Sequence, residues 1–197
     1  MLIGLTGQIG AGKSTVAEML TKRGAHIIEA DQIGREVVVS SKTVLNRLAR
    51  EYGKDILDES GILNRSELAR RAFVDDDTKA LLDSIVQPYL LKELNRRVAA
   101  AKEKHSYIII DAALLLDWDI INKCDFVIVV EAPREQRLAQ LEGRGISRSD
   151  AKKRMKRLPT VREFNKAADF IIINDSTKDA LGRKVRSVWK QITDEKH

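Results

Sequence analysis

The sequence has little cysteine, little proline and few aromatic residues. Its one cysteine, Cys124, excludes an internal disulfide, and no Cys or His spacing is typical of a zinc site. The small numbers of proline (three) and glycine (eleven) argue against a disordered or fibrous chain. No apolar run approaches the roughly 18 residues of a membrane-spanning helix, and no signal-peptide pattern opens the chain. We therefore expect a cytoplasmic globular protein of one domain, with Cys124 in or near its core.

What the chain does contain is enough apolar sequence for a core and a modest excess of basic charge. Hydrophobic residues make up 43% and charged residues 32% of the 197 positions, and the formal net charge is +6. A basic balance suits partners that carry phosphate, whether nucleotides or nucleic acids. Composition alone does not decide between them.

Four short apolar runs, rich in Ile and Val, predict buried strands, and residues 26–29 give a weaker fifth. They do not alternate with polar residues, which is typical of parallel strands covered on both faces. The runs are residues 2–6, 26–29, 107–111, 125–130 and 169–173. Because helical patterns lie between them, we expect an α/β fold with a five-stranded parallel sheet and right-handed crossovers.

The expected helices include one after the first strand, a long one at residues 76–104 and a last one at 178–192. Pro88 lies inside the long helix, so we expect a kink or a division there. The stretch from about residue 30 to 106 is mostly helical in pattern. Such an insertion often builds a substrate site beside a nucleotide-binding core.

The most specific motif is residues 7–14, Gly-Gln-Ile-Gly-Ala-Gly-Lys-Ser, which match the phosphate-binding pattern GxxxxGK[ST]. A predicted strand precedes it and a predicted helix follows, which disfavours a glycine-rich turn without a ligand. Backbone N–H groups and the helix N-terminus would hold phosphates, Lys13 would reach the β- and γ-phosphates, and Ser14 would bind Mg²⁺. The predicted nucleotide-binding residues here are Gly7, Gly10, Ala11, Gly12, Lys13, Ser14 and Thr15.

Two acidic residues follow predicted strands. Asp111 ends the run 107–111 and could bind Mg²⁺ or its water, or could simply be a strand-end or helix-capping residue. Asp31 follows the run 26–29 and could accept the proton of an attacking hydroxyl. It could equally be an N-cap, since Gln32 onward looks helical.

Arginines are candidates because phosphoryl transfer spreads negative charge over several oxygens. The candidates are Arg35, Arg65, Arg137, Arg144 and Arg148. A basic helical stretch at residues 152–157 suits a phosphate-facing lid, an RNA-facing patch or a solvated helix face. No aromatic residues interleave it, so base stacking is not supported, and the chain lacks the D-x-x-G and N-K-x-D pattern of a GTPase switch.

With these residues in place, the chain resembles the dephospho-CoA kinase family over nearly its whole length. The resemblance rests on residues 3–17, on Glu-Ala-Asp-Gln-Ile-Gly-Arg at 29–35, on Gly-Ile-Leu-Asn-Arg at 61–65 and on 168–174. It implies a P-loop kinase core at about residues 1–30, 105–133 and 165–197. It also implies a helical CoA-side insertion at about 31–104 and a lid at about 134–164.

The resemblance implies a reaction as well. ATP with Mg²⁺ would phosphorylate the ribose 3′-hydroxyl of dephospho-CoA to give coenzyme A and ADP, the last step of CoA biosynthesis. Asp31 would be the general base, Arg65 would meet the acceptor or its phosphates, and Asn174 would lie near adenine. A lid arginine, Arg137 or Arg144, would contact the transferred phosphate. The expected partners are these small molecules, with no nucleic acid or membrane, and the expected state is a monomer or weak homo-oligomer.

The chain departs from the family pattern at several positions. Gln87 replaces a usual histidine, Ala113 and Asp117 replace a usual proline and glutamate, and Gly143 stands where an arginine is usual. Leu158 replaces a usual glutamine. The alternative is a related P-loop kinase acting on another nucleoside, nucleotide or small hydroxyl compound.

Overall fold

A computed structural model of the chain describes residues 1–156 and 159–195. The chain divides into two compact units. One contains residues 1–29 and 101–197, and the other contains residues 30–100.

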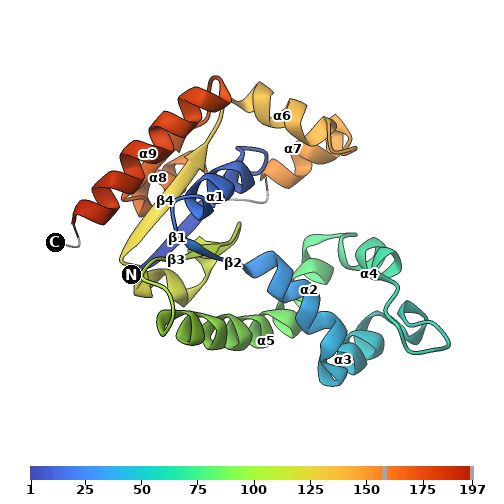
Figure 1. Cartoon of the computed structure of the whole chain (residues 1–197). Helices are drawn as coiled ribbons and strands as arrows, with labels where there is room; N and C mark the ends of the chain where they lie inside the picture. Colours follow the sequence, from blue (N-terminus) through green and yellow to red (C-terminus); the bar gives the residue numbers. More distant parts are fainter. Residues whose placement is uncertain (157–158, 196–197) are drawn as a thin grey trace. The chain divides into compact units, whose positions relative to one another are not determined.

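The first unit is built on a parallel sheet of five strands in the order β2-β3-β1-β4-β5 (Figure 1). The strands are β1 (Leu2–Gly7), β2 (His26–Glu29), β3 (Ile108–Asp111), β4 (Phe126–Glu131) and β5 (Phe170–Ile173). This confirms the predicted five-stranded parallel sheet, with strand ends that differ from the predicted ends by one residue at most. All four strand pairs are parallel, so every connection between successive strands is a crossover.

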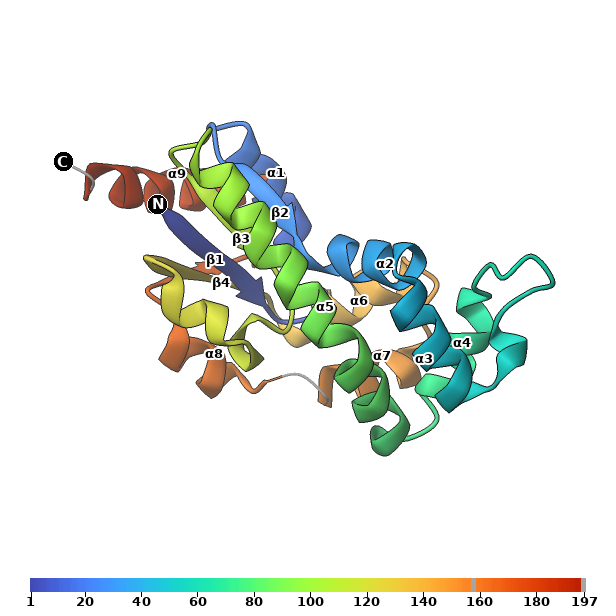
Figure 2. The ribbon, with the colours of Figure 1, turned by 90° about the horizontal axis from the view of Figure 1, so that it is seen from below.

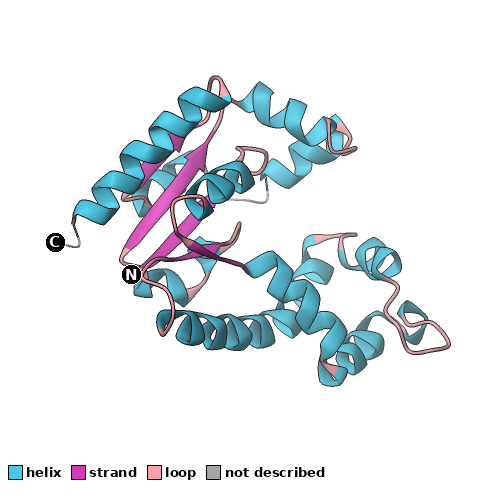
Figure 3. Ribbon diagram, in the orientation of Figure 1, coloured by secondary structure: helices cyan, strands magenta, loops and turns pink. Residues whose placement is uncertain are grey.

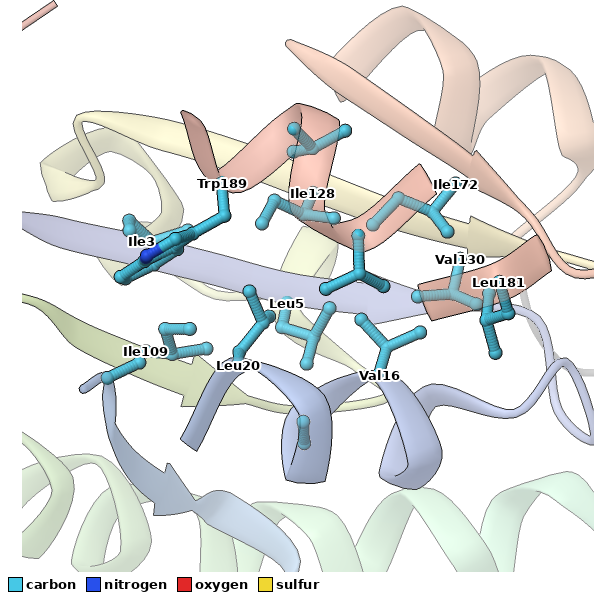
Figure 4. Close-up of a cluster of buried hydrophobic side chains, with 14 of the residues drawn as sticks. Ile3, Leu5, Val16, Leu20, Ile109, Ile128, Val130, Ile172, Leu181 and Trp189 are labelled. Carbon is cyan, nitrogen blue, oxygen red and sulfur yellow. The ribbon is translucent and has the colours of Figure 1, made fainter. Parts of the chain in front are cut away.

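Helices cover both faces of this sheet (Figure 2). On one face α1 (Lys13–Thr21) and α9 (Lys178–Asp194) bury a continuous apolar core with Ile3, Leu5 and Ile128 (Figure 4). On the other face α8 (Val161–Ala167) buries Phe164 against β4. Two further helices, α6 (Arg134–Glu142) and α7 (Arg148–Lys156), follow β4, and two short 3₁₀ helices, η2 (Leu115–Asp117) and η3 (Asp119–Lys123), lie between β3 and β4.

The second unit is helical (Figure 3). Its elements are α2 (Ala30–Ser40), α3 (Lys42–Tyr52), the 3₁₀ helix η1 (Lys54–Ile56), α4 (Arg65–Ala72) and α5 (Asp76–Lys102), the last ending in the first unit. Arg71 joins α4 to the end of α3, because it donates to the Tyr52 carbonyl at 2.5 Å and pairs with Asp55. An ion pair of Glu36 with Arg97 joins α2 to α5. Hydrogen bonds and ion pairs between its helices thus help to hold the second unit together.

Two local expectations are corrected by the structure. Helix α5 continues through Pro88, so the expected division is absent, whereas the expected kink stays a prediction. An internal proline costs about 3 kcal/mol, and burial of Ile85, Leu90 and Leu94 in the same helix offsets that cost. Helix α2 begins at Ala30, so Asp31 lies in its first turn and is not the N-cap.

Candidate phosphate-binding site

The loop between β1 and α1 is shaped by glycines in a left-handed conformation. Gly10 has a φ of 77° and Gly12 a φ of 91°. A Cβ atom on Gly10 would lie 2.7 Å from the Arg137 carbonyl oxygen, and one on Gly12 would lie 2.5 Å from the Asn174 amide nitrogen. Glycine is therefore required at both positions by the backbone conformation and by the close approach of neighbouring atoms. Arg137 of α6 contacts the loop at Gly10, and Asn174 contacts it at Gly12.

The loop leads into the N-terminus of α1. Gly12 is the N-cap and supplies no side-chain cap, and the first turn of α1 contains no acidic residue. The first N–H groups of a helix lack partners within the helix and carry partial positive charge. This end of α1, with the Ser14 side chain exposed beside it, is suited to bind an anion.

Lys13 and Asp111, predicted separately from the sequence, form an ion pair. The register of β1 with β3 sets Asp111 beside Leu5, two residues before Gly7, where the phosphate-binding motif begins. The Asp111 side chain is 9% exposed and the Lys13 side chain 18%. The lysine predicted to bind phosphate and the aspartate predicted to bind Mg²⁺ are therefore in contact with each other.

Asn174 lies directly after β5 and is buried. Its side-chain Nδ2 donates to the carbonyl of Ala11 at 2.9 Å, and its backbone N–H donates to the Glu131 carbonyl at 2.7 Å. The side chain thus contacts the phosphate-binding loop itself. The expected proximity to adenine stays a prediction.

A pocket of about 740 Å³ opens beside the start of this loop. Of the described residues, those that line it include five basic side chains and no acidic one. Arg137 has a buried Nε with no hydrogen-bond partner among residues 1–156 and 159–195, and burial, with Arg134 nearby, lowers the pKa of its guanidinium. The lining residues are Gln8, Ile9, Arg134, Arg137, Ser149, Lys152, Lys153, Met155, Lys156, Pro159, Thr160 and Val161.

Helix α7 turns one face toward this pocket. Ser149, Lys152, Lys153 and Lys156 are spaced by three and four residues, which places them along one side of a helix. In the part of the chain that the structure describes, no ion pair involves Lys152 or Lys156, whereas Lys153 lies 3.9 Å from Asp150. The pocket wall is therefore a row of cations suited to a polyphosphate.

The other predicted arginines differ in their surroundings. Arg148 pairs with Glu135 at 2.5 Å and with Glu142 at 3.3 Å, so it ties α7 to α6. Arg144 is exposed in the turn between these helices and does not line the pocket. Sequence reasoning missed Arg134, although its place directly after β4 and Pro133 is a signal that could have found it. Arg157 and Leu158 lie outside the described residues.

In the second unit, Asp31 is exposed in the first turn of α2. Arg65 opens α4, and its Nη2 donates to the Arg35 carbonyl on α2 at 3.3 Å. Arg65 thus contacts α2 at Arg35, one turn after Asp31 on the same helix. Gln87 is half-buried within α5.

The remaining expectations concern the positions that depart from the family pattern, the single cysteine, and possible metal-binding or membrane-spanning features. Ala113 follows β3, and its carbonyl accepts from the Thr6 hydroxyl at 3.4 Å, whereas Asp117 is exposed in η2. Cys124 is half-buried, as predicted, and burial raises the pKa of its thiol to about 11. Among the described residues, no cluster of three or more His, Cys, Asp or Glu could hold a metal ion. None of their helices is both long and apolar enough to cross a membrane.

Comparisons with known proteins agree with one another. A sequence model of the dephospho-CoA kinase family matches residues 1–180. The dephospho-CoA kinase of Corynebacterium diphtheriae is 36% identical over 192 residues, which cover 96% of both chains. That of Corynebacterium glutamicum is 39% identical over 96% of this chain and 98% of its own.

Solved structures give the same picture for the fold. The crystal structure of TT1252 from Thermus thermophilus is 26% identical over 97% of each chain, with a TM-score of 0.80. The dephospho-CoA kinase from Campylobacter jejuni matches at a TM-score of 0.72, with 24% identity over 100% of this chain and 98% of its own. Shikimate kinase from Acinetobacter baumannii, at a TM-score of 0.54 and 14% identity over 99% of this chain and 94% of its own, shares the P-loop kinase architecture.

Proposed function

Because the chain belongs to the dephospho-CoA kinase family, it phosphorylates dephospho-CoA with ATP, and we propose that the site around Lys13 and Asp111 carries out this transfer. The observation that carries the proposal is the glycine loop at the N-terminus of α1, with its lysine and a buried carboxylate already in contact. Residues 1–30, 105–133 and 165–197 form the proposed core, residues 31–104 the acceptor-side insertion and residues 134–164 the lid.

The loop binds the phosphates of ATP through its N–H groups and through the partial charge of α1. Lys13 moves its ammonium group from Asp111 to the β- and γ-phosphates, where it stabilises charge as the γ-phosphoryl group leaves ADP. Gly7, Gly10, Ala11, Gly12 and Thr15 shape this cradle.

Mg²⁺ would be held by Ser14 and Asp111, whose hydroxyl and carboxylate are the oxygen ligands that this ion prefers together with phosphate oxygens. When bound, it neutralises phosphate charge. The fit rests on the exposed Ser14 hydroxyl and on the Asp111 carboxylate at the carboxyl end of β3.

We propose that residues of the second unit and of the lid bind the acceptor and assist its attack. Asp31 accepts the proton of the ribose 3′-hydroxyl as that oxygen attacks the γ-phosphorus, and Arg65 meets the acceptor or its phosphates. Arg137, with its unpaired buried Nε, and Arg144 are the proposed lid arginines. Closure of the lid excludes water and suppresses ATP hydrolysis. We further propose that the enzyme is cytoplasmic and a monomer or weak homo-oligomer.

The direct test is to mix the purified protein with ATP, Mg²⁺ and dephospho-CoA and to measure coenzyme A by mass. A gain of about 80 daltons, one phosphoryl group, that depends on both substrates supports the proposal. A panel of nucleoside, nucleotide and sugar acceptors runs in parallel. ADP formation with one of these but not with dephospho-CoA would leave the phosphoryl transfer in place and contradict the acceptor.

Asp31→Asn tests the proposed base. It should keep ATP binding and lower turnover by about 10²- to 10⁴-fold, the usual contribution of a general base. Asp179→Asn is the matched control, because Asp179 is exposed in the first turn of α9 as Asp31 is in α2. Turnover near wild type in Asp31→Asn would remove Asp31 from the mechanism.

A further inference from the structure

The contact between Asn174 and the phosphate-binding loop joins residues 163 positions apart in the chain. The bond from Nδ2 to the Ala11 carbonyl is 2.9 Å long and buried. The Asn174 amide lies so close above Gly12 that a Cβ there would come within 2.5 Å of it. No other residue type at position 12 leaves room for this contact without moving the side chain.

The contact sets the orientation of one peptide group. The Ala11–Gly12 peptide is trans, as are all described peptides, so its carbonyl and its N–H point in opposite directions. With the Ala11 carbonyl turned toward Asn174, the Gly12 N–H is turned to the other side. Among the described residues that N–H donates to no backbone carbonyl, and it is therefore available to an anion.

Asn174 is itself held firmly. Its backbone N–H extends the pairing of β5 with β4 through the Glu131 carbonyl at 2.7 Å. Lys184 on α9 donates to the Ile173 carbonyl and to Asp175, each at 2.7 Å, on either side of Asn174. Sheet and helix thus fix the backbone from which the amide reaches the loop.

We propose that Asn174 is a positioning residue, which keeps the Gly12 N–H facing the phosphates by holding the Ala11 carbonyl on the opposite side. Without the amide, the Ala11–Gly12 peptide can rotate and present its carbonyl to the nucleotide, so that an acceptor replaces a donor opposite a phosphate. This role deepens the proposed function and rests on its phosphate-binding loop, but it does not depend on the identity of the acceptor.

An adenine contact and a loop-positioning role predict different results with a ligand that has no base. The experiment measures binding of inorganic tripolyphosphate with Mg²⁺, and of ATP with Mg²⁺, to wild type, Asn174→Ala and Asn174→Asp. The aspartate variant keeps the shape but its carboxylate cannot donate to the Ala11 carbonyl. The matched control is Asn122→Asp, the same exchange at an exposed residue of η3.

Loss of one buried hydrogen bond corresponds to about a 5- to 150-fold change in an equilibrium constant. We expect both Asn174 variants to weaken tripolyphosphate and ATP by a similar factor in this range, with Asn122→Asp unchanged. The ratio of the Kd for ATP to that for ITP, which differs from ATP in its base, should stay at the wild-type value.

Weaker binding of ATP with unchanged binding of tripolyphosphate would overturn the proposal and assign Asn174 to adenine. Unchanged binding of both ligands would overturn it as well. Thermal unfolding shows whether the variants fold; if Asn174→Asp does not, Asn174→Ala decides, because it introduces no charge. Failure of both to fold also overturns the proposal, since the side chain would then be needed for the fold itself. None of these measurements uses dephospho-CoA, so an error in the proposed acceptor cannot be mistaken for an error here.

Discussion

Replacing Gly12 by alanine should destabilise the first unit more than the same replacement at Gly24. The two glycines have nearly the same backbone conformation, with φ values of 91° and 92°. A Cβ on Gly24 would meet nothing within 4 Å, whereas one on Gly12 would lie 2.5 Å from the Asn174 amide. The pair therefore separates the cost of conformation from the cost of the contact.

The magnitudes follow from these two costs. An L-residue in the left-handed region costs roughly 1–2 kcal/mol, and both variants bear this cost. Gly12→Ala must also push Asn174 off the Ala11 carbonyl, and a buried group that loses its partner costs about 1–3 kcal/mol. We expect a loss of about 1–2 kcal/mol for Gly24→Ala and about 2–5 kcal/mol for Gly12→Ala.

Urea unfolding followed by tryptophan fluorescence measures the difference. Trp118 and Trp189 are both buried in the first unit, so the signal reports the unit that contains both glycines. With a slope of about 2 kcal/mol per molar urea, the two midpoints should differ by roughly 0.5–1.5 M.

A second background completes the test. In Asn174→Ala the amide is gone, so Gly12→Ala should there cost no more than Gly24→Ala, a non-additive result expected of residues in contact. Equal losses at the two glycines in the wild-type background would refute the reasoning, as would an extra Gly12 penalty that persists without the amide.

Two further predictions concern charge. The double variant Lys152→Gln, Lys156→Gln should bind ATP about tenfold more weakly at low salt, with a smaller loss at high salt, because both lysines line the basic pocket. The control is the double variant Lys178→Gln, Lys190→Gln, which removes two exposed lysines of α9. Equal effects of the two double variants on ATP binding would contradict a specific role of the pocket lysines. The pKa of His26 is lowered by burial and then by the stacked His105 ring, 4.2 Å away, so the unfolded chain binds the proton more readily and the melting temperature should fall as pH drops through the ordinary histidine range. His26→Gln should flatten this dependence, and an unchanged acid slope in that variant would exclude His26 as its source.

The sequence predicts the sheet and the phosphate-binding loop well because their signals are local. The three central strands, β1, β3 and β4, are mainly apolar runs that are buried along most of their length. The edge strand β2 has polar ends and gives the weakest pattern. The glycines of residues 7–12 have few other uses at that spacing. The start of α2 was placed late, because Ala30 is fully buried and already helical while Asp31 resembles a cap. The division expected at Pro88 was wrong, because burial of other residues of α5 outweighs one lost hydrogen bond.

The roles within the site could be predicted only in part, because they depend on contacts between distant residues. Arg137 and Arg148 look alike in the sequence. Arg148 pairs with two glutamates, whereas the Nε of Arg137 has no hydrogen-bond partner within the described part of the chain. Likewise no local pattern connects Asn174 with Ala11. Residue type indicates which chemistry a side chain can perform, and its partners in the fold decide whether it is available.

The Lys13–Asp111 pair shows why both kinds of information are needed. Pattern alone assigns the lysine to phosphate and leaves the aspartate open between metal binding and a structural role. In the structure each has the other as an opposite charge, in a place mostly withdrawn from solvent. A buried lysine without a partner would be costly, so Asp111 supports Lys13 before any nucleotide arrives. In the proposed function, phosphate would replace the carboxylate as the partner of the ammonium group. The Asp111 carboxylate, together with Ser14, would then hold Mg²⁺. One carboxylate would thus serve both as the structural partner of Lys13 and as a metal ligand.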